Sequence, residues 1–277
     1  NKRKLLGFTD NRQDAALQAG HFNDFTFVSL LRGAIYRALR DAGAAGLTDS
    51  DIGAAVRSAL GFERPLPPDT DPNDSSRADW LQDPALGGMD LGIASETLRF
   101  VLAYRTWYDQ RRGWRYTNPN LEELGLLAID YLELDEFCAY DGNFSDAPPM
   151  LRTADPECRA KAFGTLFEYM RKGLAIDAAA LDPLQLNRNK DDALRLLREP
   201  WSIGREERLL GWRWLFLTSP RRQALRGRDE DLILRGGLQT RLGKSLRSGA
   251  IWNDPEAAQL GRDAYGELIE AMVRAAQ

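Results

Sequence analysis

One short apolar segment near the start of the chain, Lys4–Thr9, constrains the fold more than any other feature. Its length, its apolar residues and the turn-forming residues after it predict a buried β-strand, whereas the patterns elsewhere are helical. A single buried strand leaves backbone donors and acceptors unpaired, at a cost of about 1–3 kcal/mol per group. We therefore expect its partner strands to lie elsewhere in a longer protein, of which this chain, which begins without Met, is a fragment.

Helical periodicity dominates the remaining sequence. Apolar residues recur every three or four positions from Leu17 to Leu39, which predicts a long helix that ends near Asp41. Prolines and aspartates over residues 63–92 predict an acidic loop, because proline breaks helices and the carboxylates repel one another. Further helices are predicted over 48–59, 95–112, 121–132, 154–174, 178–199, 204–217 and 255–276. We therefore expect a mainly α fold, an irregular multi-helix array with one N-terminal strand.

Composition is typical of a globular protein with a sizeable core. Apolar residues make up 43% of the 277 residues and charged residues 28%. The two cysteines, Cys138 and Cys158, exclude a disulfide scaffold or a cysteine-based zinc site and favour a reducing compartment. Apolar runs fall short of the ~20 residues that a membrane span requires, and the start does not resemble a signal peptide. We expect a cytoplasmic protein without a membrane partner.

No complete catalytic or metal site can be assembled from the sequence. The sole histidine, His21, is interpreted as a packing residue, since no second histidine could complete a metal site. Residues Leu242–Ser245 end like a phosphate loop but lack the upstream glycine spacing, so the match is interpreted as chance. Six carboxylates are interpreted as the solvated face of a helix: Glu122, Glu123, Asp130, Glu133, Asp135 and Glu136. We expect no catalytic residue and no metal ligand.

Positive charge is concentrated in residues 205–247, although the whole chain carries −4. This segment has eleven basic residues against five acidic ones, a net charge of +6, which leaves −10 on the remainder. Such a distribution is typical of a surface that binds a polyanion or an acidic protein, and also of a solvated helix face. Three tryptophans in or near the segment are available for base stacking or for core packing: Trp212, Trp214 and Trp252.

A polar turn follows the predicted strand. Asp10 and Gln13 have the spacing of a capping box at the start of the first helix. The N-terminus of a helix also favours phosphate binding. Arg12 is therefore interpreted either as an anion-binding residue or as one half of a structural salt bridge.

Two segments carry a resemblance to a known family. Leu5–Ala16 (LLGFTDNRQDAA) resembles the start of the second RecA-like domain of superfamily-two DEAD/DEAH-box helicases, especially the large prokaryotic helicases of phage defence. Trp114–Glu122 with Gly125–Leu127 resembles part of the helical insertion of these helicases. In the family the Asn-Arg turn lies near the nucleic-acid backbone. The resemblance thus implies three nucleic-acid-binding positions here: Thr9, Asn11 and Arg12.

The resemblance also implies a domain organisation. Residues 1–42 would enter the second helicase lobe, residues 43–92 would form a short helix and the acidic loop, and residues 93–277 would be a helical insertion. The predicted strand would then belong to a RecA-like sheet that is completed elsewhere. This sequence lacks the family's phosphate loop, DEAD/DEAH box and arginine-finger motif. ATP and Mg²⁺ are therefore expected for the parent protein and not for this segment.

The predicted function is that of a helical accessory region that guides or clamps DNA in an ATP-dependent helicase or translocase of antiphage defence. Its partners would be DNA, the remaining lobes of the same chain and other defence-system subunits. The alternative is a helical protein–protein docking module without direct nucleic-acid contact. Candidate nucleic-acid-binding residues in the basic segment are Arg221, Arg222, Arg226, Arg228, Arg241 and Lys244.

Overall fold

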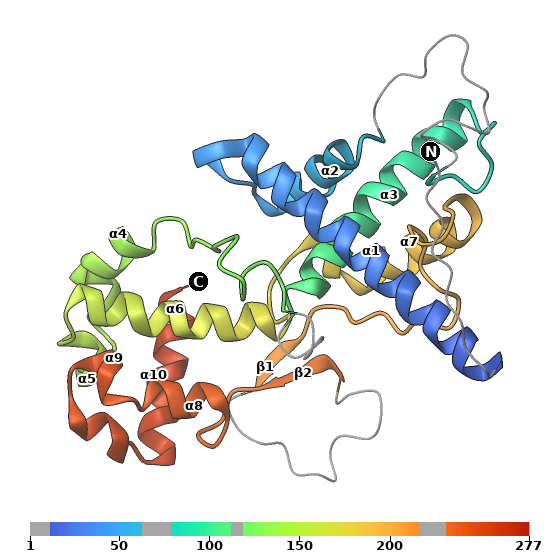
Figure 1. Cartoon of the computed structure of the whole chain (residues 1–277). Coiled ribbons are helices and arrows are strands. Elements are labelled where there is room, and N and C mark those ends of the chain that lie inside the picture. The colour runs from blue at the N-terminus through green and yellow to red at the C-terminus, as the bar shows by residue number, and fades with distance from the viewer. Residues whose placement is uncertain (1–11, 63–78, 112–118, 217–230, 277) are drawn as a thin grey trace. The chain divides into compact units, whose positions relative to one another are not determined.

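The computed structural model describes residues 12–62, 79–111, 119–216 and 231–276, and for residues 12–24 and 216 it describes the backbone alone. Within these ranges the chain is mainly helical, as the sequence predicts (Figure 1). The predicted N-terminal strand lies outside the described residues, and the division at residues 42 and 92 stays a prediction. The chain forms two compact units: unit 1, residues 1–109, 117–127 and 184–208, and unit 2, residues 110–116, 128–183 and 209–277.

Long helices build unit 1. Its elements are α1 (Arg12–Ala42), the 3-10 helix η1 (Gly43–Ala45), α2 (Asp49–Leu60), α3 (Gly88–Asp109) and α7 (Pro183–Leu196). Helix α2 packs against both α1 and α3. Apolar side chains of α1, α2, α3 and α7 are buried, among them Val28, Leu31, Ile35, Val56, Leu98, Val101, Leu102 and Leu196. The apolar periodicity that predicted a long first helix is therefore confirmed.

A buried ion pair connects the elements of unit 1. The Nε and Nη2 atoms of Arg32 donate to the two carboxylate oxygens of Asp109 at 2.8 and 2.9 Å. The two side chains are only 9% and 2% exposed. Arg32 Nη1 also donates to the carbonyl of Pro119 at 2.7 Å, and Asn120 Nδ2 donates to the carbonyl of Asp109 at 3.3 Å. The pair thus ties α1 to α3 and to the segment at residues 119–120.

Helices α2 and α3 approach each other closely at Gly53. A Cβ atom at this position would lie 2.3 Å from the backbone oxygen of Arg99 on α3. That distance is well inside van der Waals contact, and a backbone atom cannot rotate away. Gly53 is thus the residue that allows the two helices to pack at this distance.

Gly53→Ala is expected to lower the free energy of unfolding by about 1–3 kcal/mol, because the added methyl group forces α2 and α3 apart. Gly92 on α3 is a matched control, since nothing lies within 4 Å of its Cβ position. Gly92→Ala is expected to stabilise the chain by up to about 1 kcal/mol through helix propensity. Urea denaturation followed by circular dichroism measures both changes. Equal stability of the two variants would contradict the close packing at Gly53.

Unit 2 is organised around α6 (Pro156–Lys172), against which α4, α8 and α9 pack. The other elements are α4 (Leu134–Ala139), η3 (Asp141–Phe144), α5 (Pro149–Arg152), η4 (Ala179–Leu181), β1 (Trp214–Phe216), β2 (Ile233–Arg235), α8 (Arg241–Leu246), α9 (Gly249–Trp252), η6 (Pro255–Gln259) and α10 (Arg262–Ala275). Buried aromatic and aliphatic side chains fill the core, among them Phe144, Phe163, Leu166, Leu246, Trp252, Tyr265, Ile269 and Met272.

A buried arginine joins the first half of unit 2. Arg159 is 2% exposed and donates to three backbone carbonyls, those of Leu151 (3.0 Å), Cys138 (3.1 Å) and Arg152 (2.6 Å). Its Nη1 also donates to the Asp141 carboxylate at 2.7 Å. The guanidinium lies 4.4 Å from the centre of the ring of Phe144. One side chain therefore connects α6 to α4, η3 and α5.

A small parallel sheet in unit 2 is absent from the sequence prediction. Strand β1 pairs with β2 so that Leu215 lies opposite Leu234. The tyrosine hydroxyl of Tyr169 on α6 donates to the carbonyl of Arg235, and that of Tyr265 on α10 donates to the carbonyl of Gly236. These bonds fix the end of β2 between two helices.

The helix predicted over residues 121–132 is wrong. Asn120 and Glu123 do form a reciprocal capping box, which begins a helical turn. Gly125 then adopts a left-handed φ of 68°, and Leu126 N donates to the carbonyl of Leu121 at 2.8 Å. With the bond from Gly125 N to the carbonyl of Glu122, this is a Schellman motif, which ends the helix after one turn.

The helix predicted over residues 204–217 is also wrong. The segment before β1 is extended, since Trp212 N donates to the carbonyl of Leu181 and Arg213 N to the carbonyl of Leu174. Aromatic residues favour strands as well as helix cores. Backbone pairing with residues 31 and 39 positions earlier in the chain decides the conformation, and periodicity cannot reveal that pairing.

Three other boundaries differ from the prediction. The predicted acidic loop ends too late, because residues 88–92 already belong to α3, which begins at Gly88. Residues 79–87 contain no helix and only the isolated bridge of Leu81, with Trp80 and Leu81 buried. The remainder of that loop, residues 63–78, lies outside the described residues. The helices predicted to begin at 178 and 255 start with the 3-10 turns η4 and η6, and the α-helical conformation begins only at Pro183 and Arg262.

Candidate anion-binding site

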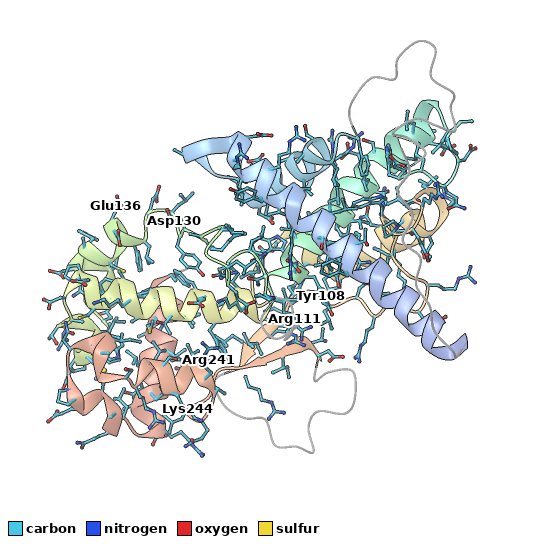
Figure 2. All side chains as sticks on the ribbon, in the orientation of Figure 1. Tyr108, Arg111, Asp130, Glu136, Arg241 and Lys244 are labelled. Carbon is cyan, nitrogen blue, oxygen red and sulfur yellow. The ribbon has the colours of Figure 1, made fainter. Side chains whose placement is uncertain are left out.

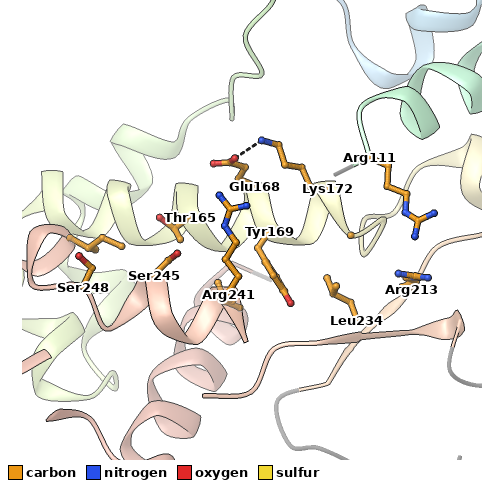
Figure 3. A pocket seen from close by; sticks show the side chains of 13 residues that line it. Arg111, Thr165, Glu168, Tyr169, Lys172, Arg213, Leu234, Arg241, Ser245 and Ser248 are labelled. Carbon is orange, nitrogen blue, oxygen red and sulfur yellow. Dashed lines mark hydrogen bonds and ion pairs between the residues drawn. The ribbon is translucent and has the colours of Figure 1, made fainter. Parts of the chain in front are cut away.

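A pocket of about 510 Å³ opens in unit 2, lined by α6, by α8 and by residues next to the small sheet (Figure 3). Four cationic side chains line it, and they come from separate parts of the chain. Arg111 follows α3, Lys172 ends α6, Arg213 precedes β1 and Arg241 begins α8. We call these four residues the cationic cluster. Among the described lining residues Glu168 is the one carboxylate, so the pocket carries excess positive charge.

Helix α6 forms one wall of the pocket. Thr165, Glu168, Tyr169 and Lys172 are spaced by three or four residues, so they share one face of the helix. Lys172 Nζ lies 2.6 Å from Glu168 Oε1, an i,i+4 ion pair in the last turn. The negative end of the helix dipole also favours a cation there. Glu168 therefore has its charge offset inside the pocket.

The arginines of the cluster are positioned by backbone structure. Arg213 Nε donates to the carbonyl of Asp231 at 2.8 Å, which orients the guanidinium beside the sheet. Arg241 is the first residue of α8, whose N-cap residue Thr240 accepts a bond from Gly243 N at 3.3 Å. The Arg241 side chain is exposed and makes no ion pair within the described part of the chain. Its five N–H donors can therefore serve a ligand.

The two ends of the pocket differ in chemistry. Figure 3 shows Arg111 and Arg213 at one end, hydroxyl groups of Ser245 and Ser248 at the other, and Arg241 between them. Planar guanidinium groups bind phosphate and carboxylate oxygens with two parallel hydrogen bonds. Serine hydroxyls both donate and accept hydrogen bonds. The arrangement can hold an oxyanion at the arginine end and a polar neutral group at the hydroxyl end.

The structure places only part of the predicted nucleic-acid-binding set. Arg241 lines the pocket, whereas Lys244 lies one turn further on α8, exposed and outside the lining (Figure 2). Arg12 is the first residue of α1, and its side chain is not described. The other predicted residues lie outside the described ranges: Thr9, Asn11, Arg221, Arg222, Arg226 and Arg228. The sequence prediction did not single out Arg111 or Lys172.

The structure distinguishes between base stacking and core packing for the three tryptophans in or near the basic segment. Trp252 is 6% exposed and its indole N–H donates to the carbonyl of Leu246 at 2.7 Å, so it is a core residue. Trp212 and Trp214 form an edge-to-face pair with ring centres 4.6 Å apart. Trp214 is 59% exposed, which leaves much of its ring accessible.

The described residues offer few other reactive groups. They contain no group of three or more potential metal ligands, and both cysteines are buried as free thiols. Burial raises the pKa of Cys138 to about 11, so its thiol stays protonated at neutral pH. Within the same residues, no helix combines the length and the apolar character needed to cross a bilayer. The cationic cluster is thus the strongest candidate site in this part of the chain.

Comparison with known proteins does not assign the chain to a family. No protein-family model, curated protein or solved structure matches this chain. The resemblance of Leu5–Ala16 to DEAD/DEAH-box helicases therefore stays a prediction, and the function is inferred from that resemblance together with the cationic cluster.

Proposed function

We propose that unit 2 binds phosphate groups of DNA through the cationic cluster. The chain would act as a helical accessory region of a cytoplasmic, ATP-dependent helicase or translocase in antiphage defence. The observation that carries the binding proposal is the convergence of Arg111, Lys172, Arg213 and Arg241 on one pocket. The helicase context rests on the sequence resemblance, and ATP with Mg²⁺ would bind other parts of the parent protein.

Electrostatics supports a local binding surface. The whole chain carries −4, and such a charge by itself repels nucleic acid. Binding therefore requires a place where positive groups outnumber carboxylates, and the pocket is such a place. Phosphate contacts of arginine and lysine provide affinity without sequence specificity, because every nucleotide carries the same backbone.

Replacing Arg213 and Arg241 together by glutamine is expected to weaken DNA binding by the whole chain at least about tenfold at moderate salt. The logarithm of the binding constant falls linearly with the logarithm of the salt concentration. Each lost phosphate contact should make this slope less steep by about 0.7–0.9. Fluorescence anisotropy with a labelled oligonucleotide, titrated at several salt concentrations, measures both quantities.

Arg262→Gln is the matched control for this experiment. Arg262 is exposed on α10 of unit 2 and does not line the pocket, so the variant removes one positive charge elsewhere. It should keep the wild-type affinity and slope within about a factor of two. An affinity that does not change with salt, or an equal loss in control and double variant, would refute the proposal.

A protein–protein docking module is the second candidate, and one observation favours it. In unit 2, Leu132 and Tyr140 are 83% and 67% exposed on either side of α4, whose Asp135 and Glu136 are also exposed. Large exposed apolar side chains are typical of interaction sites. Two results together would favour docking. The Leu132→Ser variant would no longer bind a defence-system partner, and the variant with glutamine at Arg213 and Arg241 would bind DNA as the wild type does.

A further inference from the structure

The cationic pocket differs from a groove that follows a nucleic-acid backbone. Its positive charge is gathered in one pocket of about 510 Å³, and hydroxyl groups lie at the other end. A volume of this size falls in the range of sites that enclose a small molecule, and it exceeds what a single phosphate group would fill. The geometry therefore favours a compact ligand with one anionic end.

The excess charge of the pocket fits a dianion better than a backbone phosphate. Three arginines and Lys172 face the cavity, and its described carboxylate, Glu168, is offset by Lys172 at 2.6 Å. An internal phosphodiester carries one negative charge. A terminal phosphomonoester carries about 1.5 to 2 negative charges at neutral pH and has three strong acceptor oxygens. Guanidinium groups that bind two oxygens each match such a group.

The remaining lining suits a nucleoside attached to that phosphate. Leu234, Leu242 and Ile251 supply apolar contact area. Ser245 and Ser248 lie at the end away from Arg111 and Arg213, where they can bond sugar hydroxyls or base edges. A ligand with a charged head and a partly apolar, partly polar body would satisfy both ends at once.

We propose that the pocket holds the terminal phosphate and last nucleoside of a nucleic-acid strand. This inference rests on the proposed function, since it names the part of the nucleic acid that unit 2 recognises. The same chemistry occurs in a free mononucleotide, so the test must separate the strand end from the small molecule.

The test compares three otherwise identical labelled oligonucleotides that carry a 5′-phosphate, a 3′-phosphate or no terminal phosphate. Binding to the whole chain is measured by fluorescence anisotropy. At least one phosphorylated oligonucleotide is expected to bind about tenfold more tightly than the unphosphorylated one. That advantage should disappear in Arg241→Gln and persist in Arg262→Gln, whose side chain lies outside the pocket. Adenosine monophosphate should compete only at concentrations well above those of the oligonucleotide.

Four outcomes would overturn the inference. Equal, salt-dependent binding of all three oligonucleotides would overturn it and leave the proposed function intact. An advantage that persists in Arg241→Gln would place the phosphate elsewhere. Competition by adenosine monophosphate at oligonucleotide concentrations would identify the free nucleotide as the ligand. Absence of binding to any oligonucleotide would refute the proposed function as well.

Discussion

Arg159→Met is expected to lower the free energy of unfolding of unit 2 by about 3–5 kcal/mol. Methionine fills similar space but donates no hydrogen bond, so the carbonyls of Leu151, Cys138 and Arg152 all lose their arginine donor. A buried carbonyl without a partner costs about 1–3 kcal/mol. The contact between the guanidinium and the ring of Phe144 is lost as well. Urea denaturation followed by circular dichroism measures the change.

Asp141→Asn is the matched control for Arg159, because it removes the ionic partner and keeps the three carbonyl bonds. The Asp141 side chain is 88% exposed, so its pairing with Arg159 is screened by water. We expect this variant to cost less than about 1 kcal/mol. If Asp141→Asn destabilised the chain as much as Arg159→Met, the ion pair and not the carbonyl bonds would hold these elements together.

Arg32→Met is expected to destabilise unit 1 by about 3–5 kcal/mol. The substitution leaves the carboxylate of Asp109 only 2% exposed and without its bidentate partner. Removing one partner of a buried ion pair is costly, and the carbonyl of Pro119 loses its arginine donor too. Denaturation in urea measures the loss.

Two comparisons make the Arg32 result specific. Arg37→Met removes an arginine from the same helix, but its contact with Asp41 is long, at 3.8 Å, and both side chains are more than half exposed. This variant should be nearly neutral. The double variant Arg32→Met with Asp109→Leu should recover much of the lost stability, because it removes both buried charges. A double variant as unstable as the single one would show that the carbonyl bond to Pro119 dominates.

The parts of the fold that the sequence predicted correctly depend on local patterns. The long helix α1 follows from apolar residues every three or four positions, and α6 follows from the same pattern with Pro156 in its first turn. The two wrong helix predictions have different causes. One segment contains competing local signals, and the other forms backbone hydrogen bonds with residues far away in the sequence. At residues 121–132 the apolar period suggested a helix, yet Gly125 and the Schellman motif end it after one turn.

The candidate site could be predicted only in part. Arg213 and Arg241 belong to the basic segment that charge counting identified. Lys172 forms an i,i+4 pair with Glu168, which in sequence is typical of an ordinary solvated helix face. Arg111 follows a helix that contributes nothing else to the pocket lining. The convergence of four cations is a tertiary property, because it depends on how α6, α8 and the sheet pack together.

The convergence also has a thermodynamic consequence for unit 2. Four positive groups from segments as distant as Arg111 and Arg241 repel one another once the chain folds, and Glu168 is the one described carboxylate in the lining that offsets them. Salt ions screen this repulsion and so favour folding, while the same screening weakens attraction for a nucleic acid. Folding and ligand binding are therefore linked. An anion in the pocket relieves the repulsion directly, and it can stabilise unit 2 at low salt, where screening is weakest.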